Sequence, residues 1–538
     1  MKKIVGSLVL ALIPAAFAVA AVSSHMASGP GWLAPNYDVE YNYLLNGLRF
    51  QQGVPIVFFI QPGTTLALLY AAIIYVSHAV APVGSASVVD DVWRHPEVYV
   101  DRVFASLVVL LAVASLAAGV LVWRRTKSVS AGVAVQTGLI LLAAFAQSAG
   151  LIWPETILIA IGVLFAGTLT LFILEDCSSA RLCVALGVLG GLGIASKVTF
   201  AVAALAPAVL ARSRKNAMIY IAALAGSTAV LLALIVSRLS HLTDFLAGFA
   251  LHSGSYGADG GSFDTRAYLA GALLLIRQNK IPVVVILLSV AVFVAFRWTT
   301  VLQEPQRSEL RALGWVTLVE LLMYGVVARQ PYGRYLIPVV TMMGVNLVII
   351  QRIGLAVWQQ RRRTVQAIFM LGFAAVLAIW MRNTMSALKS TRLDAAEHWA
   401  AVDAAATLQR SGAVVVLGSW ASSPAFAFAI GQFWVGDAWA KVGEELYPGQ
   451  LFLSGEGYLK TWTQGLGTGW EWPNINPVLS GTAEDAEWER VVELLKSHRV
   501  IVQGDWENIG PSLRRNPRIS VHVIHSSRLE SLVELLPR

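Results

Sequence analysis

The sequence predicts an all-α polytopic membrane domain followed by a small α/β domain. Of the 538 residues, 56% are hydrophobic and 13% are charged, and the mean hydropathy is +0.65, which is more apolar surface than a water-soluble domain can bury. Apolar runs of about 17 to 25 residues, long enough to cross the hydrocarbon core as helices, recur between residues 4 and 380. No later run is long enough to cross.

These runs predict about eleven transmembrane helices. The sixth run is overlong and contains Gly190, Gly191, Gly193 and Lys197, so it is either one helix with a break or two half-helices. The predicted spans are 4–22, 62–80, 102–123, 132–153, 155–174, 182–210, 217–236, 281–296, 313–328, 334–350 and 365–380.

Basic residues in short loops predict the orientation, because they are retained on the cytoplasmic side. Lys2 and Lys3 place the N-terminus in the cytoplasm. The basic clusters that fall on the same side are 212–215, 297–311 and 352–363. The cluster at 123–127 falls on the opposite side, so either a span is miscounted or these cations contact an anionic surface or ligand.

This orientation predicts a multi-pass protein of the plasma (inner) membrane with outer loops at 25–61 and 239–280. The membrane domain covers 1–384, and the C-terminal domain, 385–538, is extracytoplasmic. The first run, with small residues at 16–20, also suits a cleaved signal peptide, which would leave the later topology unchanged.

The C-terminal segment differs from the membrane part in charge and in pattern. Its net charge is −4, whereas the membrane part carries +12. The basic excess is therefore not gathered on a soluble face, so we expect membrane lipids or a lipid-linked phosphate as the anionic partner, and no nucleic acid. Apolar periodicity predicts helices at 393–408, 424–431 and 488–496 and strands at 413–417, 500–502 and 519–524.

The absence of several motifs narrows the function. The two cysteines, Cys177 and Cys183, form no CxxC motif, and no His/Cys cluster has zinc spacing. The sequence also lacks a P-loop and a Ser-centred nucleophile elbow. Without a P-loop the sequence does not favour ATP-driven transport, and without a zinc-spaced cluster it does not favour a metallohydrolase.

Asp38 and Glu40 are the first candidates for chemistry, because they lie just beyond the first span of a chain with few charges. Further motifs follow in order along the membrane domain. They are Gln61-Pro62-Gly63-Thr64, Asp101-Arg102, Trp153-Pro154-Glu155, the glycine-rich run 191–197 that ends in Ser196-Lys197, and Tyr332-Gly333-Arg334-Tyr335.

In this order, from 37 to 338, the motifs resemble the polyprenyl-phosphate-sugar-dependent glycosyltransferases of the GT-C superfold. The likeness is to protein O-mannosyltransferases and lipid A aminoarabinose transferases. That family carries an acidic pair in the first outer loop. Here Val39 separates Asp38 from Glu40, so spacing alone does not say which acid matches the catalytic one.

The resemblance implies transfer of a sugar from a polyprenyl-phosphate-linked donor to a hydroxyl of a glycan, lipid or protein acceptor on the extracytoplasmic face. Such a transfer needs a base for the hydroxyl proton and cations for the leaving phosphate. Asp38 is the expected base. Glu40 is expected to orient the acceptor or, together with Asp38, to hold a divalent metal ion through oxygen ligands.

The expected ligands of the donor phosphate are cations beside the predicted spans. Lys197 interrupts an apolar run, where a charge costs about 2.5 to 3.5 kcal/mol on insertion scales, so it is either a ligand or a side chain that snorkels to the interface. The donor-phosphate candidates are Arg102, Lys197, Arg266 and Arg334, and the substrate-binding candidates are His252, Tyr256 and Tyr335.

Two other functions stay open at this point. An ion-coupled transporter or a lipid-linked glycan flippase would also use charges in spans and a helix broken by glycine. A glycan ligase or polymerase with a lipid-diphosphate donor is the third reading.

Overall fold

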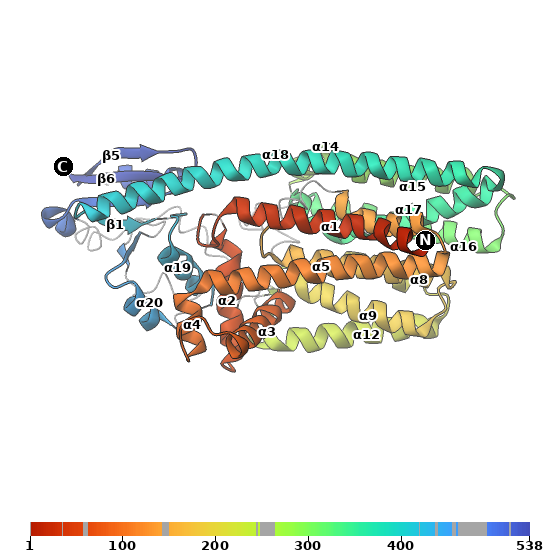
Figure 1. Ribbon diagram of the computed structural model, residues 1–538, viewed down its shortest axis with the longest axis horizontal. Helices are drawn as coiled ribbons and strands as arrows, with labels where there is room; N and C mark the ends of the chain where they lie inside the picture. Colours follow the sequence, from red (N-terminus) through yellow and green to blue (C-terminus); the bar gives the residue numbers. More distant parts are fainter. Residues whose placement is uncertain are drawn as a thin grey trace.

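The computed structural model describes residues 2–34, 36–57, 63–141, 150–240, 242–243, 246–247, 264–418, 420–435, 439–453, 459–460, 492–515 and 518–538. These residues form a bundle of long, roughly aligned helices with a small β-sheet at one end (Figure 1). The N-terminus lies at the opposite end of the bundle from the sheet.

Seven helices of the described part are long and apolar enough to cross a membrane, and a bent pair would make an eighth. The seven are α1 (Lys2–Ser28), α5 (Pro96–Thr126), α8 (Pro154–Leu174), α12 (Arg214–Leu232), α16 (Glu304–Val327), α17 (Ile337–Val357) and α18 (Arg362–Arg410). The bent pair is α14 (Thr265–Gln278) and α15 (Lys280–Phe296). The chain is thus a multi-pass membrane protein, as the sequence predicts.

The described part also contains shorter helices. They are α2 (Tyr37–Gln51), α3 (Thr64–Val80), α4 (Val88–Arg94), α6 (Val129–Gln136), α9 (Ala180–Ser196), α10 (Phe200–Ala203) and α11 (Leu205–Leu210). The 3-10 turns are η1 (Thr137–Ile140), η2 (Ala233–Arg238), η4 (Gly333–Leu336) and η5 (Gln359–Arg361).

The overlong sixth run is broken at Lys197, as its glycines indicate. Helix α9 ends at Ser196, and the backbone of Lys197 is extended. The chain then runs back, since the Arg212 N–H donates to the Cys177 carbonyl, just before α9, at 3.3 Å. Residues 180–210 therefore form two antiparallel halves with Lys197 near the turn.

The basic clusters gather at the end of the bundle that holds the N-terminus, which we call the basic end. Gly6 of α1 packs against the Trp123 ring of α5. Arg125 donates to the Leu174 carbonyl at the end of α8. The cluster at 123–127 therefore lies on the same side as Lys2 and Lys3, and the prediction that placed it on the other side is wrong because a span was miscounted.

The miscounted span is 62–80, which forms α3. The N–H of Gly63, just before α3, donates to the Ser196 carbonyl at 3.2 Å. The carbonyl of Ala81, just after α3, accepts from Arg102 Nη1 at 3.2 Å. Ser196 ends α9 and Arg102 stands in the first turns of α5, both away from the basic end. Both ends of α3 therefore lie on the sheet side of the bundle, and α3 does not cross it.

A six-stranded sheet forms the C-terminal region, in the order β3-β2-β1-β4-β6-β5. Strand β1 pairs in parallel with β2 and β4, and the other pairs are antiparallel. The elements are β1 (Val414–Leu417), α19 (Pro424–Val435), α20 (Ala440–Leu446), β2 (Leu451–Leu453), β3 (Leu459–Lys460), β4 (Val500–Gly504), α22 (Trp506–Arg515), β5 (Ile519–Ser526) and β6 (Ser531–Pro537).

Most of the elements predicted in this region are confirmed, but β2, β3, β6, α20 and α22 were not predicted. The strands at 413–417, 500–502 and 519–524 and the helix at 424–431 are present. The helix predicted at 393–408 is the far end of α18, which continues without a break from the last span. Residues 492–497 are helical, which agrees with the predicted helix at 488–496 over 492–496, and residues 488–491 lie outside the described residues.

Helix α19 packs on α2 through aromatic side chains. The Phe428 ring stacks on Trp93 of α4 with centroids 4.0 Å apart and meets Tyr41 of α2 edge-on at 5.0 Å. A β-carbon at Gly431 would approach Leu45 of α2 to 2.8 Å, so glycine allows this close contact. The C-terminal domain thus supports the helix that carries Asp38 and Glu40.

Candidate active site

Glu155, Lys197 and Arg334 form a buried cluster, which we call the cation cluster. Lys197 Nζ pairs with Glu155 Oε1, and only 2% of Lys197 and 3% of Glu155 are exposed. Arg334 Nε lies 3.7 Å from the same carboxylate oxygen. Two cations from different elements therefore converge on one carboxylate.

Aromatic rings enclose the two cations. Lys197 Nζ lies 4.1 Å from the centroid of the Tyr335 ring, and the Arg334 guanidinium lies 4.7 Å from that of Trp153 and 5.4 Å from that of Tyr332. Such contacts stabilise cations away from water. Lys197 does not snorkel to a membrane interface, since it is buried against Glu155 and Tyr335.

The glycine-rich end of α9 explains how Lys197 reaches this position. A β-carbon at Gly193 would overlap the Phe200 ring of α10, and one at Gly191 would overlap Ser227. Glycine therefore lets the returning half of the chain and α12 pack closely on α9. The break that follows turns the Lys197 side chain toward Glu155 in the first turn of α8.

Glu40 and Glu97 form a second buried group, the acidic cluster. Glu97 in the first turn of α5 accepts hydrogen bonds from the Gly31 N–H at 2.6 Å and from the Tyr41 hydroxyl at 2.7 Å. Both carboxylates face Gly31, where a β-carbon would lie 2.8 Å from Glu40 Oε2 and 3.5 Å from the Glu97 oxygens. Glycine at this position leaves room for two acids side by side.

One oxygen of Glu40 has no donor among the described residues. Oε1 accepts from the Ile152 N–H at 3.1 Å, whereas Oε2 is buried and unpartnered. Helix α2 is not a crossing helix. Burial raises the pKa of the Glu40 carboxyl to about 7, against the lowering effects of the Ile152 hydrogen bond and of His25. A carboxyl with such a pKa can exchange a proton near neutral pH.

His25 and Asp101 border the acidic cluster. His25 Nε2 lies 3.0 Å from Asp101 Oδ1, and Nδ1 lies 3.0 Å from the Gly150 carbonyl. Both ring nitrogens of His25 are therefore engaged, which fixes the orientation of the imidazole beside the acidic cluster.

The segment 150–155 connects the two clusters. It supplies Gly150 to His25, the Ile152 N–H to Glu40 and Glu155 to Lys197. The candidate active site therefore consists of buried acids on one side of a short segment and cations on the other.

The motif at 61–64 also reaches this site. The Thr64 hydroxyl donates to the Ala195 carbonyl at 3.1 Å, and the Thr65 and Ser196 hydroxyls lie 2.6 Å apart. Gln61 and Pro62 lie outside the described residues. Motifs more than 130 residues apart in the sequence therefore meet beside Lys197.

The other predicted site residues are placed as follows. Asp38 lies in α2, and its side chain is outside the described part. Arg102 contacts the Ala81 carbonyl and the Tyr99 ring rather than Glu155. Arg266 is exposed in the first turn of α14. His252 and Tyr256 lie outside the described residues.

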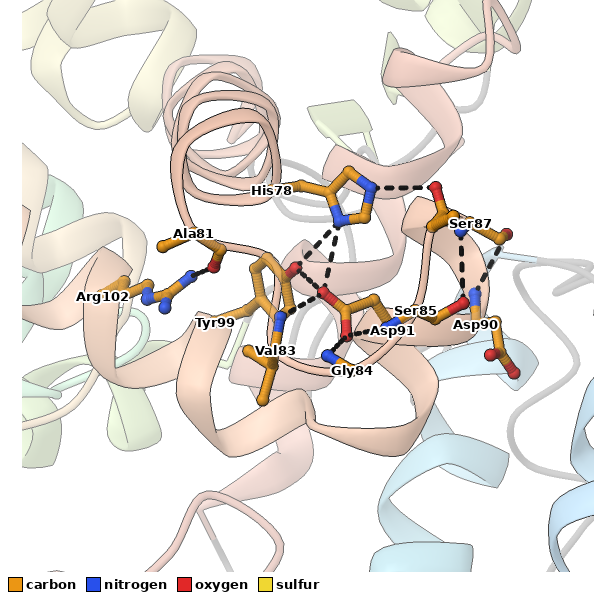
Figure 2. Close-up of polar contacts among 11 residues, drawn as sticks. His78, Ala81, Val83, Gly84, Ser85, Ser87, Asp90, Asp91, Tyr99 and Arg102 are labelled. Carbon is orange, nitrogen blue, oxygen red and sulfur yellow. Dashed lines mark hydrogen bonds and ion pairs between the residues drawn. The ribbon is translucent and has the colours of Figure 1, made fainter.

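Arg102 contacts the start of a loop, at Ala81, and Asp91 holds that loop in place (Figure 2). The buried Asp91 carboxylate accepts hydrogen bonds from the Gly84 N–H at 2.7 Å and from the Tyr99 hydroxyl at 2.5 Å, and lies 3.2 Å from His78 Nδ1. Burial raises the pKa of Asp91, but the hydrogen bonds from Tyr99, Val83 and Gly84 outweigh it and hold the pKa below its usual range. Asp91 is engaged on both oxygens, so it is a structural acid.

Glu97, His25 and Asp101 were not predicted as members of the site, although Asp101 stands in one of the quoted motifs. A signal for Glu97 was present, because His95-Pro96-Glu97 repeats the pattern of Trp153-Pro154-Glu155. In both cases proline occupies the first position of a helix and glutamate the next.

A metal ion has few ligands in the part of the chain that the structure describes. No group of three or more His, Cys, Asp or Glu side chains there is arranged to hold one. Glu40 offers a single free oxygen, and both Glu97 oxygens accept hydrogen bonds. A divalent ion held by Asp38 and Glu40 stays a prediction.

Comparison with known proteins shows the fold. No family model matches the sequence, and no curated protein matches it. A structure of ArnT from Cupriavidus metallidurans in the apo state is similar over 99% of this chain and 98% of that one, with 12% identity and a TM-score of 0.51. The same protein bound to undecaprenyl phosphate gives 13% identity over the same shares and a TM-score of 0.47. The chain therefore has a GT-C-like fold similar to that of ArnT.

Proposed function

We propose that this chain is an integral-membrane glycosyltransferase that moves a sugar from a polyprenyl-phosphate-linked donor to an acceptor hydroxyl. The observation that carries the proposal is the convergence of Lys197 and Arg334 on Glu155, next to the buried acids Glu40 and Glu97. Transfer from a phosphate needs cations for the leaving group and a carboxylate base for the acceptor. The similarity of fold to ArnT agrees with this class of reaction.

In the proposed reaction, the acceptor hydroxyl loses its proton to Asp38 and its oxygen attacks the anomeric carbon. The bond from that carbon to the phosphate oxygen breaks, and the electron pair stays with the polyprenyl phosphate. Glu40 Oε2, which has no donor among the described residues, accepts a hydrogen bond from the acceptor and orients it. Buried, preorganised groups of this kind stabilise developing charge more strongly than water does.

Lys197 and Arg334 are the proposed main ligands of the donor phosphate, and Tyr335 contacts the donor beside them. Two cations share one carboxylate here, so a phosphate can serve as a second anionic partner. Arg102 and Arg266 stay proposed as further phosphate ligands, and His252 and Tyr256 as sugar ligands. A divalent ion between Asp38 and Glu40 would add Lewis acidity at the reacting oxygens, but no step above depends on it.

We further propose that the basic end faces the cytoplasm and that the sheet faces the outside of a plasma (inner) membrane. The support is the gathering of short basic loops at one end of the bundle. Reaction would then take place at the extracytoplasmic surface, where the acceptor can be a glycan, a lipid or a protein.

The experiment uses the full chain purified in detergent and incubated with undecaprenyl-phosphate-linked sugars and candidate acceptors. Turnover in detergent supports a transferase and excludes pure transport, because no membrane separates two compartments. A folded protein that binds the donor without turnover favours the transporter or flippase alternative. Mass spectrometry of glycans and glycolipids from cells with and without the protein would then identify the acceptor.

A further inference from the structure

A cavity of about 360 Å³ lies at the corner where α14 and α15 meet at 93°. Arg277, Lys280 and Asn279 line it from the corner itself, and Trp380 and Arg382 line it from α18. Its volume falls within the range of sites that bind small ligands. We call it the corner cavity. None of its lining residues belongs to the cation cluster or to the acidic cluster.

Among the described residues, the charged side chains that line the corner cavity are all positive. They are Arg277, Lys280 and Arg382, and no acidic residue of the described part lines it. None of the three cations forms an ion pair with a carboxylate of the described residues. A cavity with three such cations favours an anionic occupant.

Uncharged donors add to this preference. The Asn279 side chain donates to the Leu275 carbonyl at 2.8 Å and does not cap α15, so the positive N-terminal end of that helix is left without a side-chain cap at the cavity. The Trp380 indole is 2% exposed, and its N–H has no acceptor among the residues that the structure describes. A buried donor without an acceptor is unfavourable, and a bound anion would supply the missing acceptor.

The corner cavity lies beside a crossing helix, below its end. Trp380 stacks on Phe17 of α1 with ring centroids 5.9 Å apart. Phe17 precedes the end of α1 at Ser28 by eleven residues, which is about 16 Å along a helix. A lone cation at membrane depth is unfavourable, so cations there favour an anionic partner. The side chains of Arg277, Lys280 and Arg382 are exposed on the outside of the bundle. An anionic lipid can therefore reach the cavity laterally from the bilayer.

We propose that the corner cavity binds the phosphate group of an anionic membrane lipid. The phosphate contacts Arg277, Lys280 and Arg382 and accepts a hydrogen bond from the Trp380 indole, while the acyl or prenyl chain lies along α15. Basic pockets between transmembrane helices bind lipid head groups in this way. The proposal does not depend on the transferase reaction.

Native mass spectrometry of the full chain in detergent tests the proposal. The probes are dioleoyl phosphatidylglycerol, dioleoyl phosphatidylcholine and undecaprenyl phosphate, each titrated separately. The test variant combines Arg277→Gln with Arg382→Gln, which changes two exposed side chains. The control is Arg181→Gln, an exposed cation that does not line the cavity.

The wild type is expected to retain an anionic probe at least about tenfold more tightly than phosphatidylcholine, and the double variant to lose that preference, because two of the three cations that donate charge-assisted hydrogen bonds to the phosphate are gone. The control is expected to keep it. A loss seen with phosphatidylglycerol alone identifies a bulk phospholipid, and a loss seen with undecaprenyl phosphate alone identifies a lipid-linked carrier. Equal retention of both anionic probes by wild type and double variant overturns the proposal, whatever the enzymatic activity.

Discussion

Glu155 and Lys197 form an ion pair almost fully excluded from water, although they stand 42 residues apart, Glu155 in the first turn of α8 and Lys197 directly after the end of α9. The pair exists because α9 breaks directly before Lys197 and α8 begins with Pro154 and Glu155. Arg334 approaches the same carboxylate from η4. Three motifs that the sequence presents separately are thus one site.

Removal of the Glu155 charge should destabilise the protein strongly. Glu155→Gln leaves Lys197 buried without its carboxylate, a change that costs about 3 to 5 kcal/mol, whereas replacing both partners of a buried pair by apolar residues costs much less. We expect a large fall in Tm for Glu155→Gln and a smaller one for the double variant Glu155→Leu with Lys197→Met. Asp90→Asn, which breaks the exposed pair with Arg94, is the control and should leave Tm unchanged. An unchanged Tm for Glu155→Gln would contradict the pairing.

Glu40 should make stability depend on pH. Its folded pKa of about 7 lies above the ordinary value of 4.5, so the folded state holds a proton that the unfolded state releases between these values. The contribution of Glu40 is full below pH 4.5 and is lost as pH rises through about 7, a change of about 3 kcal/mol. Glutamine does not ionise, so Glu40→Gln should not lose this stability as the pH rises. We expect the Tm of Glu40→Gln, measured relative to that of the wild type by thermal unfolding, to be higher at pH 8 than at pH 5. The same Tm difference between variant and wild type at both pH values would rule out the raised pKa.

Gly63 should be more sensitive to substitution than Gly53, although both have positive φ, +60° and +71°. Alanine at either position incurs about 1 to 2 kcal/mol for a left-handed backbone. At Gly63 the β-carbon would also overlap the Tyr43 hydroxyl, whereas Gly53 has nothing within 4 Å. We expect Gly63→Ala alone to displace the segment beside Ser196 and to weaken undecaprenyl phosphate binding. Equal binding by the two variants would contradict the role of this segment.

Glu530 should hold the C-terminal domain to the membrane domain. Its carboxylate accepts from Gln503 Nε2 at 2.7 Å and from the Ser422 hydroxyl at 2.6 Å, and lies 2.8 Å from His398 Nδ1. The Ala34 N–H, between α1 and α2, donates to the same Ser422 hydroxyl at 3.2 Å.

Glu530→Ala leaves these buried donors unpaired, and we expect a loss of about 3 to 5 kcal/mol with faster proteolysis of the sheet. Glu534→Ala, in β6, removes the partner of Arg499, which is a more exposed pair, and should change proteolysis little. Identical proteolysis of the two variants would mean that the Glu530 network does not anchor the domain.

The membrane fold was largely predictable because apolar runs report spans directly, but α3 shows the limit of that signal. Its composition is as apolar as that of a span, and only contacts to Ser196 and Arg102 reveal that both its ends lie on one side. Strand β6 was missed although it is apolar, since a run at the chain end has no turn signal after it.

The sequence predicted the cations of the candidate site better than it predicted the acids. Lys197 was found because a charge in an apolar run is costly, and Arg334 and Tyr335 were found through the order of motifs. Glu97 escaped because an acid in the first turn of a helix is ordinary. Only the fold brings it beside Glu40, through the glycine at position 31.

Release of undecaprenyl phosphate from an undecaprenyl-phosphate-linked sugar, followed by mass spectrometry with purified full chain in detergent, tests the central claim most directly. The wild type should release the carrier only when an acceptor is present, and Asp38→Asn should lower the rate by at least about 100-fold, as expected for loss of a general base. Absence of release by the wild type with every donor and acceptor tried, or wild-type release by a folded Asp38→Asn variant, would contradict the proposed reaction.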